Sequence, residues 1–231
     1  MKIIWWETLL VVCLPLFILG LYVLYRLFTI PNPIVNNTLE EILPKLNTGD
    51  LFIVRYRSVF NQFIKVVCEE NWSHTGFIYK DNTNAVYIIE MAEYSEFKRK
   101  GYTKKPGYED IKTLDGLNMV PIEQWLELNN GRIVGYLEYD KQRPENSKVM
   151  RVIKEYADRE LDANIINWLA GIYGWMDYSN TKKSQSCFEF TAYLLQQLGM
   201  LDTEKQPNWY YPARIAKIPD YKNIQIVQLS L

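Results

Sequence analysis

The sequence predicts an α+β protein in which an N-terminal transmembrane helix precedes one domain, where an antiparallel β-sheet packs against a helix beginning at Cys187. Three observations lead to this prediction. Residues 73–91 alternate apolar and polar side chains on both sides of a turn, as paired strands do. Residues 186–199 carry the signals that start and stop a helix. Residues 8–25 contain no charged side chain.

The stretch of residues 8–25 is nearly all apolar, and with its apolar flanks it is long enough to span a bilayer of about 30 Å. Aromatic residues lie toward both ends, and Arg26 follows, as is typical at a membrane interface. A cleaved secretory signal is the alternative, but no small-residue cleavage site precedes Pro31. We therefore expect residues 1–30 to be a single-pass membrane anchor, and residues 31–46 to be a linker with a short helix.

The rest of the chain, residues 47–231, is long enough to form one domain with its own core. Besides the hairpin and the Cys187 helix, its pattern predicts strands at 50–56 and 131–139 and helices at 60–68 and 147–161. Residues 165–175 are apolar on most sides and either line a hydrophobic acyl pocket or pack beside the Cys187 helix. The basic stretch 98–105 is expected to be a solvated loop, and the net charge of -1 argues against nucleic-acid binding.

The predicted hairpin brings a histidine and a glutamate together. With a turn centred on Asn82, antiparallel pairing places His74 directly opposite Glu90. Opposed Cβ atoms in a sheet lie about 5 Å apart, so the carboxylate can hydrogen-bond the imidazole and fix its tautomer. A turn centred just after Asn82 places Met91 opposite His74 instead, because a shift of one residue reverses the faces.

The helix that begins at Cys187 has a clear start and end. Ser186 followed by Glu189 has the form of a capping box, and Gly199 has the position of a C-terminal cap. Cys187 then lies in the first turn, where the helix dipole and free N–H groups favour a thiolate and can bind an oxyanion. The alternative is that Cys187 is a small core residue. We interpret Glu189 as a cap rather than as a catalytic group.

A cysteine hydrolase needs an imidazole to take the proton of the thiol, and His74 is the only histidine in the chain. The alternatives are a half-buried strand histidine and, for Glu90, an exposed charge at a strand end. One histidine and three scattered cysteines, Cys13, Cys68 and Cys187, do not form a metal-binding pattern. We therefore expect neither a metal nor another cofactor.

In this order, the residues resemble the circularly permuted branch of the papain-like cysteine amidases of the NlpC-like superfamily. In that branch a histidine strand and a polar third residue on the next strand precede the nucleophilic cysteine. The matching pieces lie between residue 47 and about residue 215, and they are Gly49-Asp50-Leu51, Ser73-His74-Thr75-Gly76, Glu90, Val120-Pro121-Ile122 with Trp125, and Cys187-Phe188-Glu189.

The resemblance implies a papain-like domain in which Cys187 is the nucleophile, His74 the general base and Glu90 the group that orients His74. The family usually has a small hydroxyl residue after the cysteine, whereas this chain has Phe188. The implied activity is that of a membrane-anchored cysteine hydrolase or acyltransferase. It would cleave an amide, ester or thioester bond through a thioester acyl-enzyme.

Related permuted enzymes act on peptides, lipids or protein conjugates, so we expect an acyl-lipid, peptide or protein-conjugate substrate. The alternative is a catalytically idle structural or interaction protein of a membrane or virus particle. A third hypothesis is a lipid-binding module that uses the same groove, which predicts ligand capture that survives Cys187→Ala.

The cysteines form no paired framework, which favours a reducing compartment for the domain. A glycan on the sequon at Asn71 would stand three residues from His74, which argues against a eukaryotic secretory lumen. Proteins resembling this branch occur in bacteria and large DNA viruses. We therefore expect a bacterial or virion membrane to be compatible with the sequence.

Overall fold

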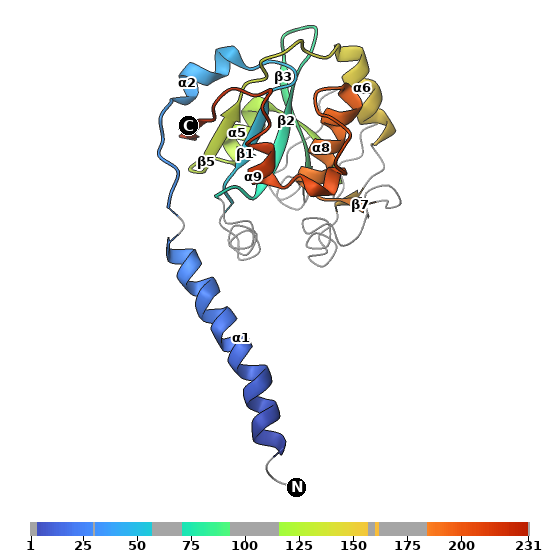
Figure 1. Ribbon diagram of the computed structural model, residues 1–231. Coiled ribbons are helices and arrows are strands. Elements are labelled where there is room, and N and C mark those ends of the chain that lie inside the picture. The colour runs from blue at the N-terminus through green and yellow to red at the C-terminus, as the bar shows by residue number, and fades with distance from the viewer. Residues whose placement is uncertain are drawn as a thin grey trace.

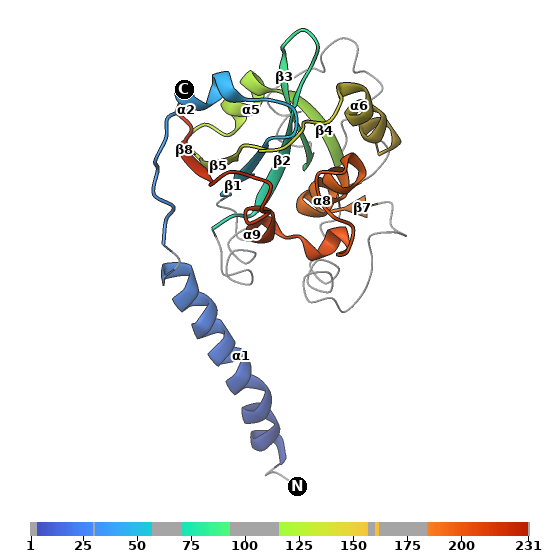
Figure 2. The same cartoon turned by 45° about the horizontal axis from the view of Figure 1, so that its top comes forward.

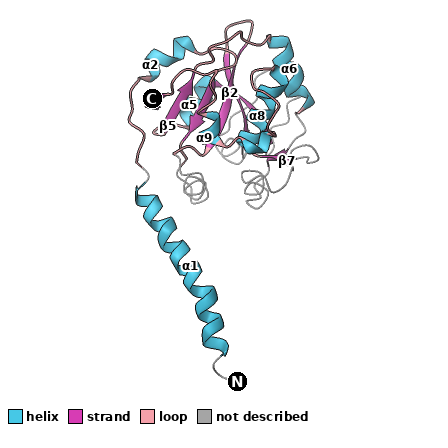
Figure 3. Ribbon diagram, in the orientation of Figure 1, coloured by secondary structure: helices cyan, strands magenta, loops and turns pink. Residues whose placement is uncertain are grey.

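The structure is a computed structural model that describes residues 4–29, 31–56, 71–92, 116–156, 160–161 and 184–230. Within these residues, six strands form an antiparallel sheet, and strands are drawn as arrows in Figures 1 and 3. Their spatial order is β4, β3, β2, β1, β5, β8. They are β1 (Leu51–Val54), β2 (His74–Lys80), β3 (Val86–Ala92), β4 (Gly116–Pro121), β5 (Ile133–Leu137) and β8 (Gln225–Gln228). The α+β class with an antiparallel sheet is confirmed.

Two further short strands extend the β4 edge of the sheet. They are β6 (Glu160–Leu161), which pairs antiparallel with β4, and β7 (Ser184–Gln185), which pairs parallel with β6. Strand β7 leads directly into helix α8 (Cys187–Leu198), so the sheet itself fixes where α8 begins.

Helices cover both faces of the sheet, as the turned view in Figure 2 shows. Because side chains alternate along a strand, Leu51 and Ile53 of β1 pack with α8 and α6 (Asn146–Glu155). Phe52 and Val54 face the other way, toward α5 (Ile122–Leu128) and α2 (Leu39–Ile42). The remaining short helices are η1 (Leu43–Lys45), η2 (Pro207–Trp209) and α9 (Pro212–Ile215).

Most predicted elements have counterparts in the structure. The strands expected at 50–56 and 131–139 are β1 and β5, each shorter at both ends, and the helix expected at 147–161 is α6, which ends at Glu155. Thr38 caps α2 with a capping box, so a short helix does precede the sheet. The helix expected at 60–68, the basic stretch 98–105 and the apolar segment 165–175 lie outside the described residues.

The turn of the β2–β3 hairpin is longer than the sequence suggested. Asp81 Oδ1 accepts hydrogen bonds from the backbone N–H groups of Thr83 at 2.8 Å and Ala85 at 2.9 Å, and Asn84 has a positive φ of 66°. A carboxylate that binds N–H groups ahead of it stabilises such a loop. The turn therefore centres on Thr83, and the register moves by two residues from the one expected with a turn at Asn82.

The start of β1 is fixed by a buried carboxylate. Asp50 accepts hydrogen bonds from Tyr136 Oη at 2.8 Å, the Tyr139 N–H at 2.9 Å and Arg143 Nη1 at 2.7 Å. Burial raises the pKa of Asp50, and these donors act against that effect. The network ties β5 and the residues that follow it to the start of β1.

Helix α1 (Ile4–Thr29) precedes the sheet and extends away from it in Figure 1. Side chains in α1 are described for residues 13–15, 17, 18, 20–26 and 29. Over the residues that the structure describes, we find no helix whose length and apolar character would let it cross a membrane. The anchor at residues 8–25 stays a prediction from the sequence.

Candidate active site

Cys187 is the first residue of α8 and is 9% exposed. The predicted capping box is present, since Ser186 Oγ accepts from the Glu189 N–H at 3.4 Å and Glu189 Oε2 accepts from the Ser186 N–H at 3.3 Å. Gly199 closes the helix with a φ of 77°. Glu189 is thus a helix cap, and Cys187 lies at the positive end of the α8 dipole.

His74 and Glu90 meet, although not as a directly opposed pair. Phe77 pairs with Ile89, and the same register continued by one residue places Gly76 opposite Glu90. His74 lies two residues before Gly76 and therefore on the same face of β2. His74 Nε2 lies 2.7 Å from Glu90 Oε2, a contact made diagonally across the two strands.

Gly76 provides the space for this diagonal contact. A Cβ atom at Gly76 would lie 2.7 Å from Ile88 Cγ2 and 3.6 Å from Glu90 Oε2. Because glycine has no side chain, the Glu90 carboxylate can lean over residue 76 toward the ring of His74. Gly76 is part of the resemblance, but no role in the site was predicted for it.

A tryptophan from helix α5 donates a hydrogen bond to the same carboxylate oxygen. Trp125 Nε1 donates to Glu90 Oε2 at 3.2 Å, and the indole stacks on Phe52 with ring centres 5.2 Å apart and planes 5° apart. Glu90 is 2% exposed and Trp125 is fully buried. A buried indole N–H needs an acceptor, but the sequence alone did not identify Glu90 as that acceptor.

Cys187 and Glu90 both act on the ionisation of His74. Burial of the ring disfavours its charged form, but the charge of Cys187, the charge of Glu90 and hydrogen bonding to both outweigh that effect. Together they raise the pKa of His74 to about 10. His74 is the first residue of β2, so its ring lies at the end of the strand, and Cys187 at the start of α8 is close enough to act on its charge. The three predicted site residues are therefore brought together.

The ring of His74 also meets an aromatic neighbour. The centre of the Tyr56 ring lies 5.0 Å from the centre of the imidazole, with the planes tilted by 43°. The guanidinium carbon of Arg132 lies 4.3 Å from the centre of the Tyr56 ring. Tyr56 restricts the positions that the imidazole can adopt, and neither of these contacts was predicted from the sequence.

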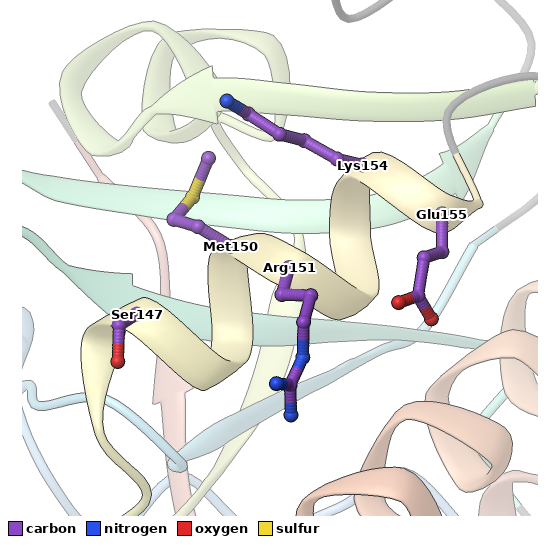
Figure 4. A pocket seen from close by; sticks show the side chains of 5 residues that line it. All are labelled: Ser147, Met150, Arg151, Lys154 and Glu155. Carbon is purple, nitrogen blue, oxygen red and sulfur yellow. The ribbon is translucent and has the colours of Figure 1, made fainter.

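The surface also has a hollow on helix α6, which is not part of this candidate site. Its lining comes from successive turns of α6 and contains none of the three candidate residues (Figure 4). The lining side chains are Ser147, Met150, Arg151, Lys154 and Glu155. In the described part of the chain, no group of three or more His, Cys, Asp or Glu side chains is placed to hold a metal ion.

This chain is similar to a known protein in fold only. No family model matches this sequence, and no curated protein matches it. Among solved structures, the crystal structure of the metalloprotein yiiX from Escherichia coli O157:H7 is similar, with a TM-score of 0.51 and 14% sequence identity. The match covers 77% of this chain and 95% of that chain. The likeness extends over much of the chain and, at this identity, describes its fold alone.

Proposed function

We propose that this protein is a papain-like cysteine hydrolase or acyltransferase that uses Cys187, His74 and Glu90 to cleave an amide, ester or thioester bond. The observation that carries the proposal is the environment of the His74 ring. One nitrogen lies 2.7 Å from Glu90, and the charge of Cys187 favours the protonated ring. A base beside a thiol, oriented by a third group, is the arrangement that activates a cysteine nucleophile.

In the proposed mechanism His74 carries a proton in the resting protein, as its raised pKa favours, and Cys187 attacks as the thiolate. The thiolate donates an electron pair to the carbonyl carbon of the substrate, and the C=O π electrons move to the oxygen. The Cys187 N–H, at the start of α8, is available for that oxyanion. When the tetrahedral intermediate collapses, the bond to the leaving group breaks, and the leaving group takes the proton from His74.

Acylation changes the ionisation of His74 in the direction that the reaction needs. The thioester carries no charge, so the contribution of Cys187 to the raised pKa of His74 is lost. The neutral imidazole then accepts a proton from water, which attacks the thioester and regenerates Cys187. An alcohol or amine in place of water makes the protein a transferase.

The substrate class follows from the resemblance, which allows an acyl-lipid, a peptide or a protein conjugate. We also propose that residues 8–25 anchor the domain in a membrane. The described apolar side chains of α1 support this, because Phe17, Ile18 and Tyr25 are 63%, 56% and 63% exposed. An anchored domain is close to acyl-lipids, which favours a lipid or a membrane-bound protein as the substrate.

The test is the hydrolysis of a p-nitrophenyl ester of a short fatty acid by the purified chain. Cys187→Ala and His74→Gln should each reduce the rate by roughly a hundredfold or more. Cys13→Ser is the matched control, because Cys13 lies in α1 and is exposed. Hydrolysis that survives Cys187→Ala contradicts the proposal. Binding of acyl-lipid without turnover in the unaltered chain indicates a binding module instead.

A further inference from the structure

Two threonines connect the first turn of α8 to the strand that carries His74. Thr75 Oγ1 lies 3.2 Å from the Cys187 carbonyl oxygen and 2.9 Å from Thr191 Oγ1. Thr191 Oγ1 lies 2.9 Å from the same carbonyl oxygen. Both threonines are fully buried. The contacts join β2 to α8 at the residue proposed as nucleophile.

The two hydroxyl groups form a unit. Each carries one proton, so only two of these three contacts are hydrogen bonds at any moment. The arrangement that uses the two shortest distances has Thr75 donating to Thr191 and Thr191 donating to the Cys187 carbonyl. Thr191 alone would bond only within its own helix, so Thr75 is the group that links the helix to the sheet.

The link lies where the site needs it. Thr75 follows His74 in β2, and successive side chains of a strand point to opposite faces. Thr75 therefore faces α8, while His74 points to the face that holds Glu90 and Trp125. A shift of α8 along β2 would move Cys187 away from the imidazole without disturbing the contact between His74 and Glu90.

We propose that Thr75 and Thr191 are positioning residues, whose hydroxyl groups fix the first turn of α8 against β2 and so hold Cys187 beside His74. This inference rests on the proposed function, because it concerns the same site. It predicts that Thr75→Val separates the two groups more than Thr191→Val does. In the second variant Thr75 can still donate directly to the Cys187 carbonyl at 3.2 Å.

Two measurements on the full chain in detergent micelles test this without any substrate. The first is the rate at which iodoacetamide alkylates Cys187 at neutral pH. The second is the NMR titration of the imidazole, which gives one signal because His74 is the only histidine, provided that no histidine tag is added. We expect Thr75→Val to slow alkylation by roughly tenfold to a hundredfold. It should also lower the titration midpoint of His74, and Thr75→Ser should restore both.

Thr48→Val is the matched control. Thr48 is also a buried threonine, and its hydroxyl lies 3.2 Å from the Lys80 carbonyl oxygen, at the far end of β2. It should lower the melting temperature and leave both readouts unchanged. The inference is overturned if Thr75→Val and Thr191→Val change the readouts no more than Thr48→Val does. An unaltered chain that alkylates normally but turns over no substrate contradicts the proposed function and leaves this inference standing.

Discussion

At the scale of single residues, the Glu90 carboxylate holds one nitrogen of the His74 imidazole. Nε2 lies 2.7 Å from Glu90 Oε2, which also accepts the Trp125 N–H at 3.2 Å. This leaves Nδ1 for Cys187. Because the carboxylate is buried and both partners bind the same oxygen, it cannot turn away from the ring without losing both hydrogen bonds.

Glu90→Gln tests the charge of this carboxylate. The substitution keeps the size of the side chain and removes the charge that favours protonated His74. We expect the NMR titration midpoint of His74 to fall from about 10 by about one to three pH units. Glu127→Gln is the control, because Glu127 is exposed on the same helix as Trp125. Equal midpoints in the two variants would show that Glu90 does not act on the ring.

At the scale of elements, the site depends on the diagonal contact between His74 of β2 and Glu90 of β3 and on the start of α8. The diagonal contact forms because Gly76 leaves room for the Glu90 side chain. The start of α8 works because Ser186 and Glu189 satisfy N–H groups on both sides of Cys187. Each feature can be removed by a single substitution.

Gly76→Ala should destabilise the domain by about 1–3 kcal/mol, because the new Cβ would lie 2.7 Å from Ile88 Cγ2. Leucine has no methyl group on its Cβ, so Ile88→Leu should recover part of the loss in the double variant. Urea denaturation of the two single variants and the double variant measures this. If the effects of the two substitutions simply add, the predicted clash is absent.

Ser186→Ala should cost about 1 kcal/mol of unfolding free energy, because the helix loses its N-terminal cap. It should also slow the alkylation of Cys187, which follows in the fraying turn. Thr38→Ala is the matched control, since Thr38 forms the capping box of α2. Its loss should lower stability and leave alkylation unchanged. Similar alkylation rates in the unaltered chain, in Ser186→Ala and in Thr38→Ala would rule out a role for the α8 cap in holding the nucleophile.

At the scale of the whole molecule, the segment before residue 47 contacts the domain at its two ends. Ile42 and Leu46 are 0% and 1% exposed in the core on the α5 face. The Asn36 and Asn37 N–H groups donate to the Ile226 carbonyl in β8 at 3.0 and 3.1 Å. The segment predicted as a linker with a short helix therefore contacts β8 through Asn36 and Asn37 and the core through Ile42 and Leu46.

Shortened chains separate the anchor from the domain. A chain of residues 31–231 should fold and remain in solution when mixed with phospholipid vesicles, whereas the full chain should float with the vesicles. A chain of residues 47–231 loses two buried apolar side chains and should be less stable by several kcal/mol. Flotation of both longer chains, or of neither, would contradict the anchor at residues 8–25.

The sequence predicted those parts of the site that depend on local signals. The α8 capping box lies within four consecutive residues, and Gly199 ends the same helix, so both could be read directly. The contact between His74 and Glu90 was expected from a hairpin whose register was wrong by two residues. The contact exists because a shift of two keeps both side chains on the same face.

The sequence could not predict the contacts that join distant segments. Trp125 reaches Glu90 only after α5 packs under the sheet, and Thr75 reaches Thr191 only after α8 packs on its other face. The turn length depended on the carboxylate of Asp81 and on the positive φ of Asn84, which a search for common turn pairs does not reveal.

The most direct test of Cys187 as the nucleophile is to find which residue an acyl donor modifies. The full chain is mixed briefly with a p-nitrophenyl ester, quenched in acid and examined by intact and peptide mass spectrometry. We predict one acyl group per chain, carried by Cys187 and released by hydroxylamine, and no acyl group in Cys187→Ala. Acylation of another residue would contradict Cys187 as the nucleophile, and equal acylation of Cys187 after His74→Gln would contradict His74 as its base.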